Sequence, residues 1–135
     1  MTSNSYSSPG DTPDGDVIGA GDERQQTDRD NVRDLADIPS IEVITKSIVM
    51  LMSAAAEKLG LAEGAADDTV DLDEARKLIT ALAGLVDAAK ADLGLHAAPV
   101  RDGLKGLQLA FREKSAYPDA PGAGPGEKYT GPVRG

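Results

Sequence analysis

Apolar residues recur at alternating spacings of three and four through the middle of the chain. Between Asp71 and Leu93 they form one unbroken row: Leu72, Ala75, Ile79, Leu82, Val86, Ala89 and Leu93. This spacing puts every member on one face of an α-helix, and Leu78 and Leu85 widen that face. The pattern therefore predicts a central amphipathic helix that needs two neighbours to cover it.

Two further stretches show helical spacing. The first runs from about residue 40 to residue 59 and is followed by Gly60, a natural C-terminal stop. Its apolar face consists of Ile41, Ile44, Ile48, Leu51, Met52, Ala55 and Leu59. The second runs from Pro99 to about residue 116, and its narrower face consists of Val100, Leu104, Leu107 and Phe111. Gly103 and Gly106 each lower its helix propensity by roughly 1 kcal/mol, which indicates close approach of a backbone or a soft helix.

These patterns predict an all-α fold, a small three-helix domain over residues 38–117 made of a helical hairpin plus a third helix. Asp71 is expected to cap the central helix, with Glu74 completing a capping-box-like arrangement. Residues 1–37 are predicted to be an acidic disordered tail, in which 28–37 could form a short weak helix. Residues 118–135 are predicted to be a flexible tail, because alternating Pro and Gly disfavour helix and strand.

The net charge of -9 is unevenly distributed, since residues 94–135 carry six basic and four acidic side chains. An acidic chain repels nucleic-acid phosphates unless a local basic face prevails. Such a face exists on the third predicted helix, where Arg101, Lys105, Gln108 and Arg112 form one polar stripe. Its ordinary interpretation is a solvated face. The alternative is an anion-binding face for an acidic protein, for RNA or for the acidic N-terminal tail of this chain.

Several apolar residues lie away from the main helical faces. Val43 and Met50 fall nearly opposite the face of the first helix, and Leu109 lies off the face of the third. Another segment of the same chain could cover them, or they form a surface for a protein partner. Because three short helices bury little area, the sequence predicts a homodimer with the first helix at its interface. In the C-terminal tail, Lys128 and Tyr129 form a candidate docking motif, with plain disorder as the alternative.

Residues that carry chemistry are scarce. The chain has no cysteine and one histidine, His96, which stands in a predicted loop without the partners of a catalytic triad. We expect no enzyme, no catalytic residue, no cofactor and no small-molecule substrate. Several acidic residues lie just before the central helix or in its first turn: Asp67, Asp68, Asp71, Asp73 and Glu74. It lacks the spacing of a calcium loop, and acids are favoured at a helix N-terminus in any case, so no metal site is predicted.

Nothing in the sequence predicts a membrane segment. The longest uncharged apolar stretch, residues 47–56, is about half of what a bilayer requires, and residues 1–16 lack the pattern of a secretory signal. The expected location is cytoplasmic.

Four separated strings then suggest a family. They are IEVITKSIVMLMSAAAEKLGL, DLDEARKLITALAGL, RDGLKGLQLAFREKS and PDAPGAGPGEKYTGPV. Together they closely resemble actinobacterial members of the domain-of-unknown-function family numbered eighteen forty-four. The resemblance implies a small cytoplasmic helical protein without an established activity or cofactor, and it hints at a link to translation.

Two functions follow from these observations. The first is a non-enzymatic helical interaction or adaptor protein that associates with a protein partner or with itself through Val43, Met50 and Leu109. The alternative is a translation-associated accessory factor that binds the ribosome or RNA through Arg101, Lys105 and Arg112. The overall acidity favours the first, and the basic flank of the third helix keeps the second open.

Overall fold

The computed structural model describes residues 35–62, 64 and 70–134, and the chain divides into two units after Pro39. In the first unit, residues 35–37 form a helical turn, and the amide of Ile38 donates to the carbonyl of Leu35 over 3.3 Å. The tail predicted for residues 1–27 and the start of the weak helix predicted after it lie outside the described residues.

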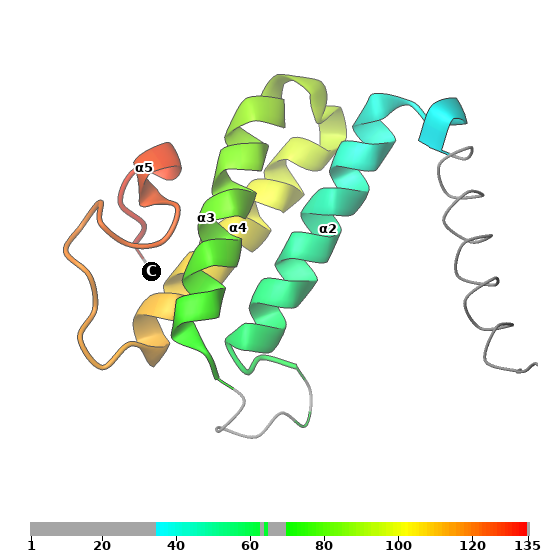
Figure 1. The fold of residues 1–135 in the computed structure, drawn as a ribbon. Coiled ribbons are helices and arrows are strands. Elements are labelled where there is room, and N and C mark those ends of the chain that lie inside the picture. Colours follow the sequence, from blue (N-terminus) through cyan, green and yellow to red (C-terminus); the bar gives the residue numbers. More distant parts are fainter. Residues whose placement is uncertain (1–34, 63, 65–69, 135) are drawn as a thin grey trace, which may run out of the picture. The chain divides into compact units, whose positions relative to one another are not determined.

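The second unit contains three long helices, α2 (Ser40–Lys58), α3 (Leu72–Ala89) and α4 (Ala97–Lys114), and a short one, α5 (Glu127–Thr130). Helix α3 is central, since it contacts α2, α4 and α5 (Figure 1). The described residues contain no strand. The predicted all-α, three-helix fold is confirmed.

The hydrophobic core is formed by the faces that the spacing predicts. From α2 it takes Ile48 and Ala55, with Leu59 just beyond the helix. From α3 and the turn after it come Ala75, Ile79, Leu82, Ala83, Val86, Ala89 and Leu93. From α4 come Val100, Leu104, Leu107 and Phe111. Of the row predicted along the central helix, only Leu72 is half-buried rather than buried.

The turn between α2 and α3 is defined by local signals at both ends. Gly60 has a φ of 72°, and the amides of Gly60 and Leu61 bond back to the carbonyls of Glu57 and Ala56, which is a Schellman motif. At the start of α3, the carboxylate of Asp71 accepts the amide of Glu74 over 3.2 Å. The predicted N-cap is therefore correct.

The reciprocal half of the predicted capping box is absent. The amide of Asp71 donates instead to the carbonyl of Lys58 over 2.7 Å, which ties α3 to the end of α2. The carboxylate of Glu74 accepts from Lys77 over 2.8 Å, and this hydrogen bond raises the pKa of Lys77 above its ordinary value.

The central α-helix ends before the apolar row that predicts it. Helix α3 ends at Ala89, and the chain continues as two 3-10 helices, η2 (Lys90–Asp92) and η3 (Gly94–His96). Leu93 lies between them and is still buried, so the apolar row outlasts the α-helix. Pro99 falls in the first turn of α4, as expected for a residue without an amide proton.

The two glycines of α4 have different surroundings. Met52 of α2 packs over Gly103, so the small residue there admits a side chain rather than a neighbouring backbone. A Cβ at Gly106 would meet nothing within 4 Å. Close approach therefore explains the first glycine only.

The prediction of a flexible C-terminal tail is wrong. We call residues 118–134 the C-terminal segment. They fold back onto α3 and α4, and residues 124–127 are buried (Figure 1). Within the segment α5 forms one helical turn that begins after Gly126, whose φ of 76° suits glycine. The Pro and Gly content of the segment suggested disorder because the segment has no apolar face. It is held instead by a few specific polar contacts.

None of the helices in the described part of the chain combines the length and the apolar character that crossing a bilayer requires.

Candidate anion-binding groove

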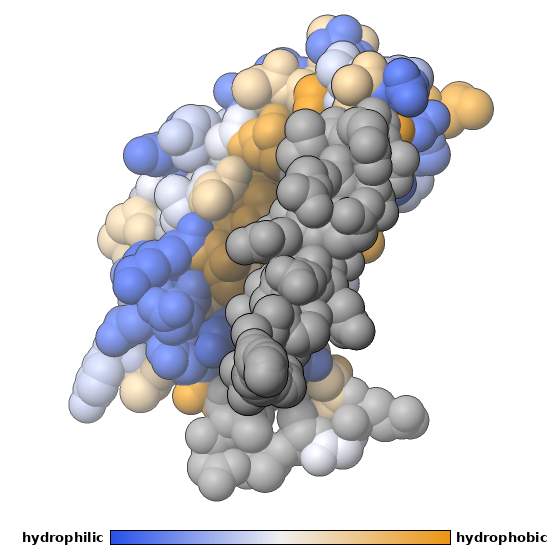
Figure 2. Space-filling model, turned by 45° about the vertical axis from the view of Figure 1, so that its right-hand side comes forward, coloured by the Kyte–Doolittle hydropathy of each residue, from blue (hydrophilic) through white to orange (hydrophobic). Residues whose placement is uncertain are grey.

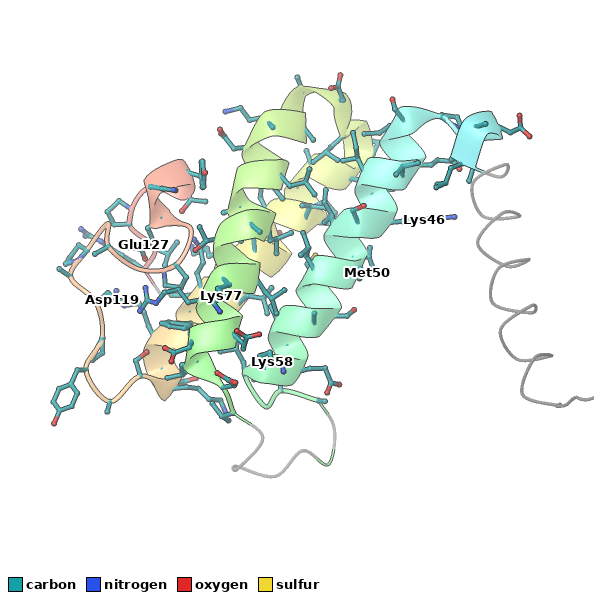
Figure 3. All side chains as sticks on the ribbon, in the orientation of Figure 1. Lys46, Met50, Lys58, Lys77, Asp119 and Glu127 are labelled. Atoms are coloured by element: carbon teal, nitrogen blue, oxygen red, sulfur yellow. The ribbon has the colours of Figure 1, made fainter. Side chains whose placement is uncertain are left out.

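A buried carboxylate organises the C-terminal segment. Glu127 lies within the folded C-terminal segment (Figure 3). It is 3% exposed, and its oxygens accept hydrogen bonds from the amides of Gly122 over 2.7 Å, Gly124 over 3.2 Å and Val133 over 3.4 Å. A carboxylate that leaves water needs such donors, because an unpaired buried charge is very costly. Glu127 thereby closes residues 122–133 into a compact loop.

Gln108 joins this loop to α4. Its amide nitrogen donates to the carbonyl of Pro125 and to the hydroxyl of Thr130, each over 3.1 Å, and the side chain is 2% exposed. The sequence predicts Gln108 on a solvated polar stripe, and that prediction is wrong. The residue belongs to the stripe by position, but the C-terminal segment covers it.

Glycines permit the contact with α3. A Cβ at Gly126 would stand 2.7 Å from the Cβ of Ala83 and 3.3 Å from the carbonyl oxygen of Ile79, so only glycine fits. On α3 itself, a Cβ at Gly84 would come within 3.2 Å of the ring of Tyr129. The backbone of the segment and the ring of Tyr129 thus lie directly against α3.

The start of the segment is anchored by charged groups. Arg76 of α3 pairs with the carboxylate of Asp119 over 2.9 Å, and its guanidinium lies 4.9 Å from the ring centre of Phe111. Arg112 of α4 donates to the carbonyl of Asp119 over 3.1 Å. Arg112, predicted as part of the anion-binding face, is therefore engaged by the chain itself.

The other two residues of that predicted face line a groove between α4 and the C-terminal segment. We call this hollow, of about 390 Å³, the basic groove. Arg101 and Lys105 contribute to it from α4, and Arg134 contributes from the segment. Its apolar lining consists of Leu104, Pro132 and Val133. Among the described residues that line it there is no carboxylate.

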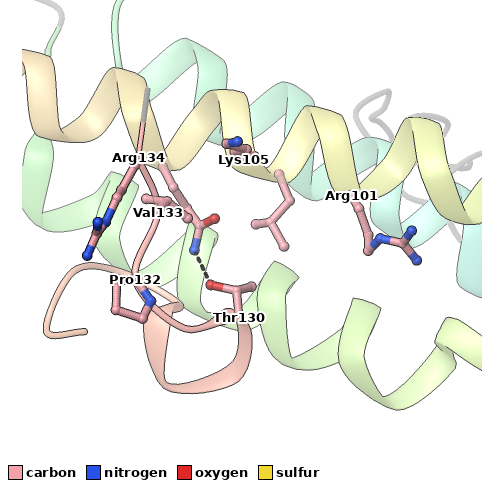
Figure 4. A pocket seen from close by; sticks show the side chains of 8 residues that line it. Arg101, Lys105, Thr130, Pro132, Val133 and Arg134 are labelled. Atoms are coloured by element: carbon pink, nitrogen blue, oxygen red, sulfur yellow. Dashed lines mark hydrogen bonds between the residues drawn. The ribbon is translucent and has the colours of Figure 1, made fainter. Parts of the chain in front are cut away.

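The three cations of the basic groove do not converge on one point. Figure 4 shows Arg101 and Arg134 toward opposite ends of the view, with Lys105 on α4 between them. Within the described residues, none of the three forms an ion pair. The arrangement suits negative charges spread along a ligand better than one compact anion.

A second hollow, of about 220 Å³, adjoins the basic groove. The two share Arg101, Leu104 and Thr130, and the second reaches Tyr129 and Val86 of α3. It also contains Asp87 and Lys90, whose side chains pair with each other over 3.2 Å. A ligand in the basic groove can therefore continue toward α3.

The residues predicted as a partner interface are unequally exposed. Met50 is 73% exposed and its neighbour Val49 is 56% exposed, whereas Val43 and Leu109 are half-buried. Met50 projects from α2 near Lys46 (Figure 3), and the side of the molecule on which α2 lies shows apolar surface next to strongly hydrophilic patches (Figure 2). Whether these residues meet a partner stays a prediction.

The predicted docking pair lies within the folded C-terminal segment. The amine of Lys128 lies 5.1 Å from the ring centre of Tyr129, and Tyr129 is 42% exposed. Since that ring packs at Gly84, the pair first serves the docking of the segment onto its own domain. Binding of this pair to another protein stays a prediction.

Other candidate chemistry is sparse. His96 is exposed in η3. Among the described residues, no three His, Cys, Asp or Glu side chains are grouped so that they could hold a metal ion. Asp67 and Asp68 of the acidic link lie outside the described residues.

The sequence reasoning missed Arg134, Glu127 and the burial of Gln108. One signal was present: Gln108 is the uncharged member of an otherwise cationic stripe, as expected of a position that another segment covers. No comparable signal exists for Arg134, because its place depends on how the C-terminal segment folds back.

A comparison with protein families finds a match over the part of the chain that forms the three long helices. A family model described as Domain of unknown function (DUF1844) matches residues 40–113, which is more than half of the chain. This range spans α2, α3 and all of α4 except its last residue. Neither a curated protein nor a solved structure matches the chain. The chain belongs to the domain-of-unknown-function family DUF1844.

Proposed function

We propose that this chain is a non-enzymatic interaction module that binds a protein partner through the basic groove. The observation that carries the proposal is the lining of this groove, which combines Arg101, Lys105 and Arg134 with apolar side chains and lacks a carboxylate among the described residues. In a chain with a net charge of -9, such a lining is a local reversal of sign. It favours an acidic partner.

A protein partner suits this groove better than RNA does. Single-stranded nucleic acid is usually bound by a longer basic track with aromatic rings on which bases stack. Here the nearby ring, that of Tyr129, lies against Gly84. The negative charge of the remaining chain also repels a long polyanion.

The non-enzymatic part of the proposal rests on the groups in the groove. Its hydroxyl, that of Thr130, accepts from Gln108 and donates to the carbonyl of Gly131 over 2.9 Å. No general base activates it within the described lining of the groove. Binding is the activity that these groups support.

The test is affinity purification of the tagged full chain from its native cell, with and without ribonuclease and at low and high salt. The double variant Arg101→Glu/Lys105→Glu should lose a protein that the wild type retains. Lys46→Glu, an exposed charge reversal on α2, is the control and should retain it. A partner that the double variant also retains contradicts the proposal, and one lost on ribonuclease treatment supports the RNA alternative.

A second candidate is self-association through α2, favoured by the exposure of Met50 and Val49. Covering such side chains stabilises an assembly by roughly 1.5–3 kcal/mol each when burial is complete. Two-fold pairing is the commonest arrangement among soluble homo-oligomers.

Sedimentation equilibrium tests self-association. The wild type should form a dimer at micromolar concentration, and Met50→Lys should dissociate it. Leu95→Lys, which changes a 96% exposed leucine in η3, is the matched control and should leave the dimer intact. A monomeric wild type, or a dimer that Met50→Lys does not weaken, removes this candidate.

A further inference from the structure

We infer that the ligand of the basic groove is an extended acidic peptide segment whose acidic residues flank at least one apolar side chain. This inference rests on the proposed function and specifies its partner. It follows from how the charges are spread, from what lies between them and from which hydrogen-bonding groups are already engaged.

The positive charges of the basic groove are spread along it. Arg101 and Lys105 lie one turn apart on α4, which corresponds to roughly 6 Å along a helix axis, and Arg134 stands on the other wall. The three side chains diverge in Figure 4. A single phosphate or carboxylate cannot contact all of them at once. An extended chain that carries acids at alternate positions can, because such side chains are about 7 Å apart.

Apolar side chains line the space between the charges. Leu104 is buried beneath the hollow, and Val133 and Pro132 line it from the C-terminal segment. Leu104 is already shielded, so a purely hydrophilic ligand would leave Pro132 and the exposed part of Val133 in contact with water. A Leu, Ile, Val or Phe side chain between the acids would cover them and thereby add affinity that charge alone does not provide.

Neutral hydrogen-bond donors of the basic groove are already engaged within the chain. A site for a compact phosphate usually presents several unengaged N–H or O–H groups in a cluster. In the basic groove, the amide of Gln108 already donates to Pro125 and Thr130, and the amide of Val133 donates to Glu127. The hydroxyl of Thr130 donates to Gly131. Recognition is therefore left to the three cations and the apolar lining.

The adjoining hollow gives the ligand a direction. It continues from Arg101 and Leu104 toward Tyr129 on the wall formed with α3. The peptide can thus run from Arg134 across Leu104 toward Arg101 and end beside Tyr129 with an apolar or neutral residue, because the carboxylate of Asp87 in this hollow would repel an acid. This path predicts that Arg101, shared by both hollows, matters more than Lys105.

Selection from a random seven-residue peptide display library on the full chain tests the inference. Enriched sequences should alternate Asp or Glu with Leu, Ile, Val or Phe. A fluorescent copy of the most enriched peptide should bind about tenfold more weakly to Arg101→Glu, somewhat less weakly to Lys105→Glu, and unchanged to Lys46→Glu. Replacing its apolar residues by Ser should also weaken binding about tenfold.

Several results would overturn the inference. They are enrichment of basic or uncharged peptides, no enrichment at all, enriched peptides that bind Arg101→Glu as well as wild type, and Ser-substituted peptides that bind as well as the parent. A fluorescent uridine decamer that binds more tightly than the selected peptide would assign the groove to RNA.

This experiment separates two failures. If the native partner depends on Arg101 and Lys105 but the selected peptides are not acidic and apolar, the proposed function stands and the ligand class is wrong. If acidic and apolar peptides bind the groove but no native partner depends on it, the ligand class stands and the proposed function fails.

Discussion

The three-helix core and the C-terminal segment are stabilised in different ways, although both belong to one folded unit. The core is held by many apolar side chains spread over three helices, including Ile48, Ile79 and Leu104. The C-terminal segment is held by two buried polar residues, Glu127 and Gln108, and by a glycine that touches α3. Because the core has many apolar contacts, a small change in one of them should leave it folded. Because the C-terminal segment has few contacts, the loss of one of them should be enough to weaken its docking.

This difference bears on the basic groove, because one wall comes from each region. Arg101 and Lys105 stand on a helix that the core stabilises, and Arg134 stands on the segment. Undocking the segment should therefore open the groove while the helices persist.

Ile79→Asp should unfold the whole second unit. Ile79 is 0% exposed at the centre of α3, and an unpaired charge there costs several kcal/mol against a total stability of roughly 5 kcal/mol for so small a core. Far-ultraviolet circular dichroism should show the loss of helix. Ala81→Asp, at an exposed position of the same helix, is the control and should remain helical. A helical Ile79→Asp protein would mean that this position is not buried.

Gly126→Ala should undock the C-terminal segment and leave the helices folded. The positive φ alone costs a β-carbon about 1 kcal/mol, and the contact with Ala83 adds about 1–3 kcal/mol. Hydrogen exchange should increase in residues 122–133 with an unchanged circular dichroism spectrum.

Gly122→Ala is the matched control for that variant. Gly122 also has a positive φ, of 87°, but a Cβ there would make only an ordinary contact with the side chain of Pro132, 4.0 Å away. It should show the conformational cost without the steric one, and so a much smaller increase in exchange. Equal effects of the two variants would mean that the contact between Gly126 and α3 does not hold the segment.

Gln108→Leu should weaken docking by about 1–3 kcal/mol, because the buried carbonyl of Pro125 and the partly buried hydroxyl of Thr130 both lose their donor. Thr130→Val removes one of these two hydrogen bonds and should cost about 1 kcal/mol. Exchange of residues 122–133 measures both. If Gln108→Leu leaves this exchange unchanged, the two hydrogen bonds do not hold the segment.

The same contrast explains what could be predicted from the sequence. Helix positions follow from local spacing, since the row from Leu72 to Leu93 needs only a period of 3.6 residues to define its buried face. The stops were also local, as with Gly60 and Asp71. The wall of the basic groove on α4 can be predicted for this reason, because Arg101 and Lys105 lie one turn apart on a predictable helix.

The wall of the basic groove that the C-terminal segment forms cannot be predicted from the sequence. Docking of the C-terminal segment depends on Gly126 meeting Ala83 and on Gln108 meeting Pro125, and no periodic pattern connects these positions. A high content of Pro and Gly ordinarily indicates disorder. In this segment, however, the Pro and Gly residues form tight turns around one buried carboxylate. An acidic residue among the glycines of such a stretch, like Glu127, can be buried when nearby backbone amides donate hydrogen bonds to it.

The smallest effect should distinguish the two glycines of α4. Gly106→Ala should stabilise the core by up to about 1 kcal/mol, since alanine favours helix and meets nothing within 4 Å. Gly103→Ala gains the same propensity but must displace the end of Met52, so its net effect should be nearer zero. The midpoints of unfolding in urea, measured for the two variants and the wild type, test both expectations. A Gly106→Ala protein that is less stable than wild type would mean that this face of α4 is covered, which would point to an interface that the isolated chain does not show.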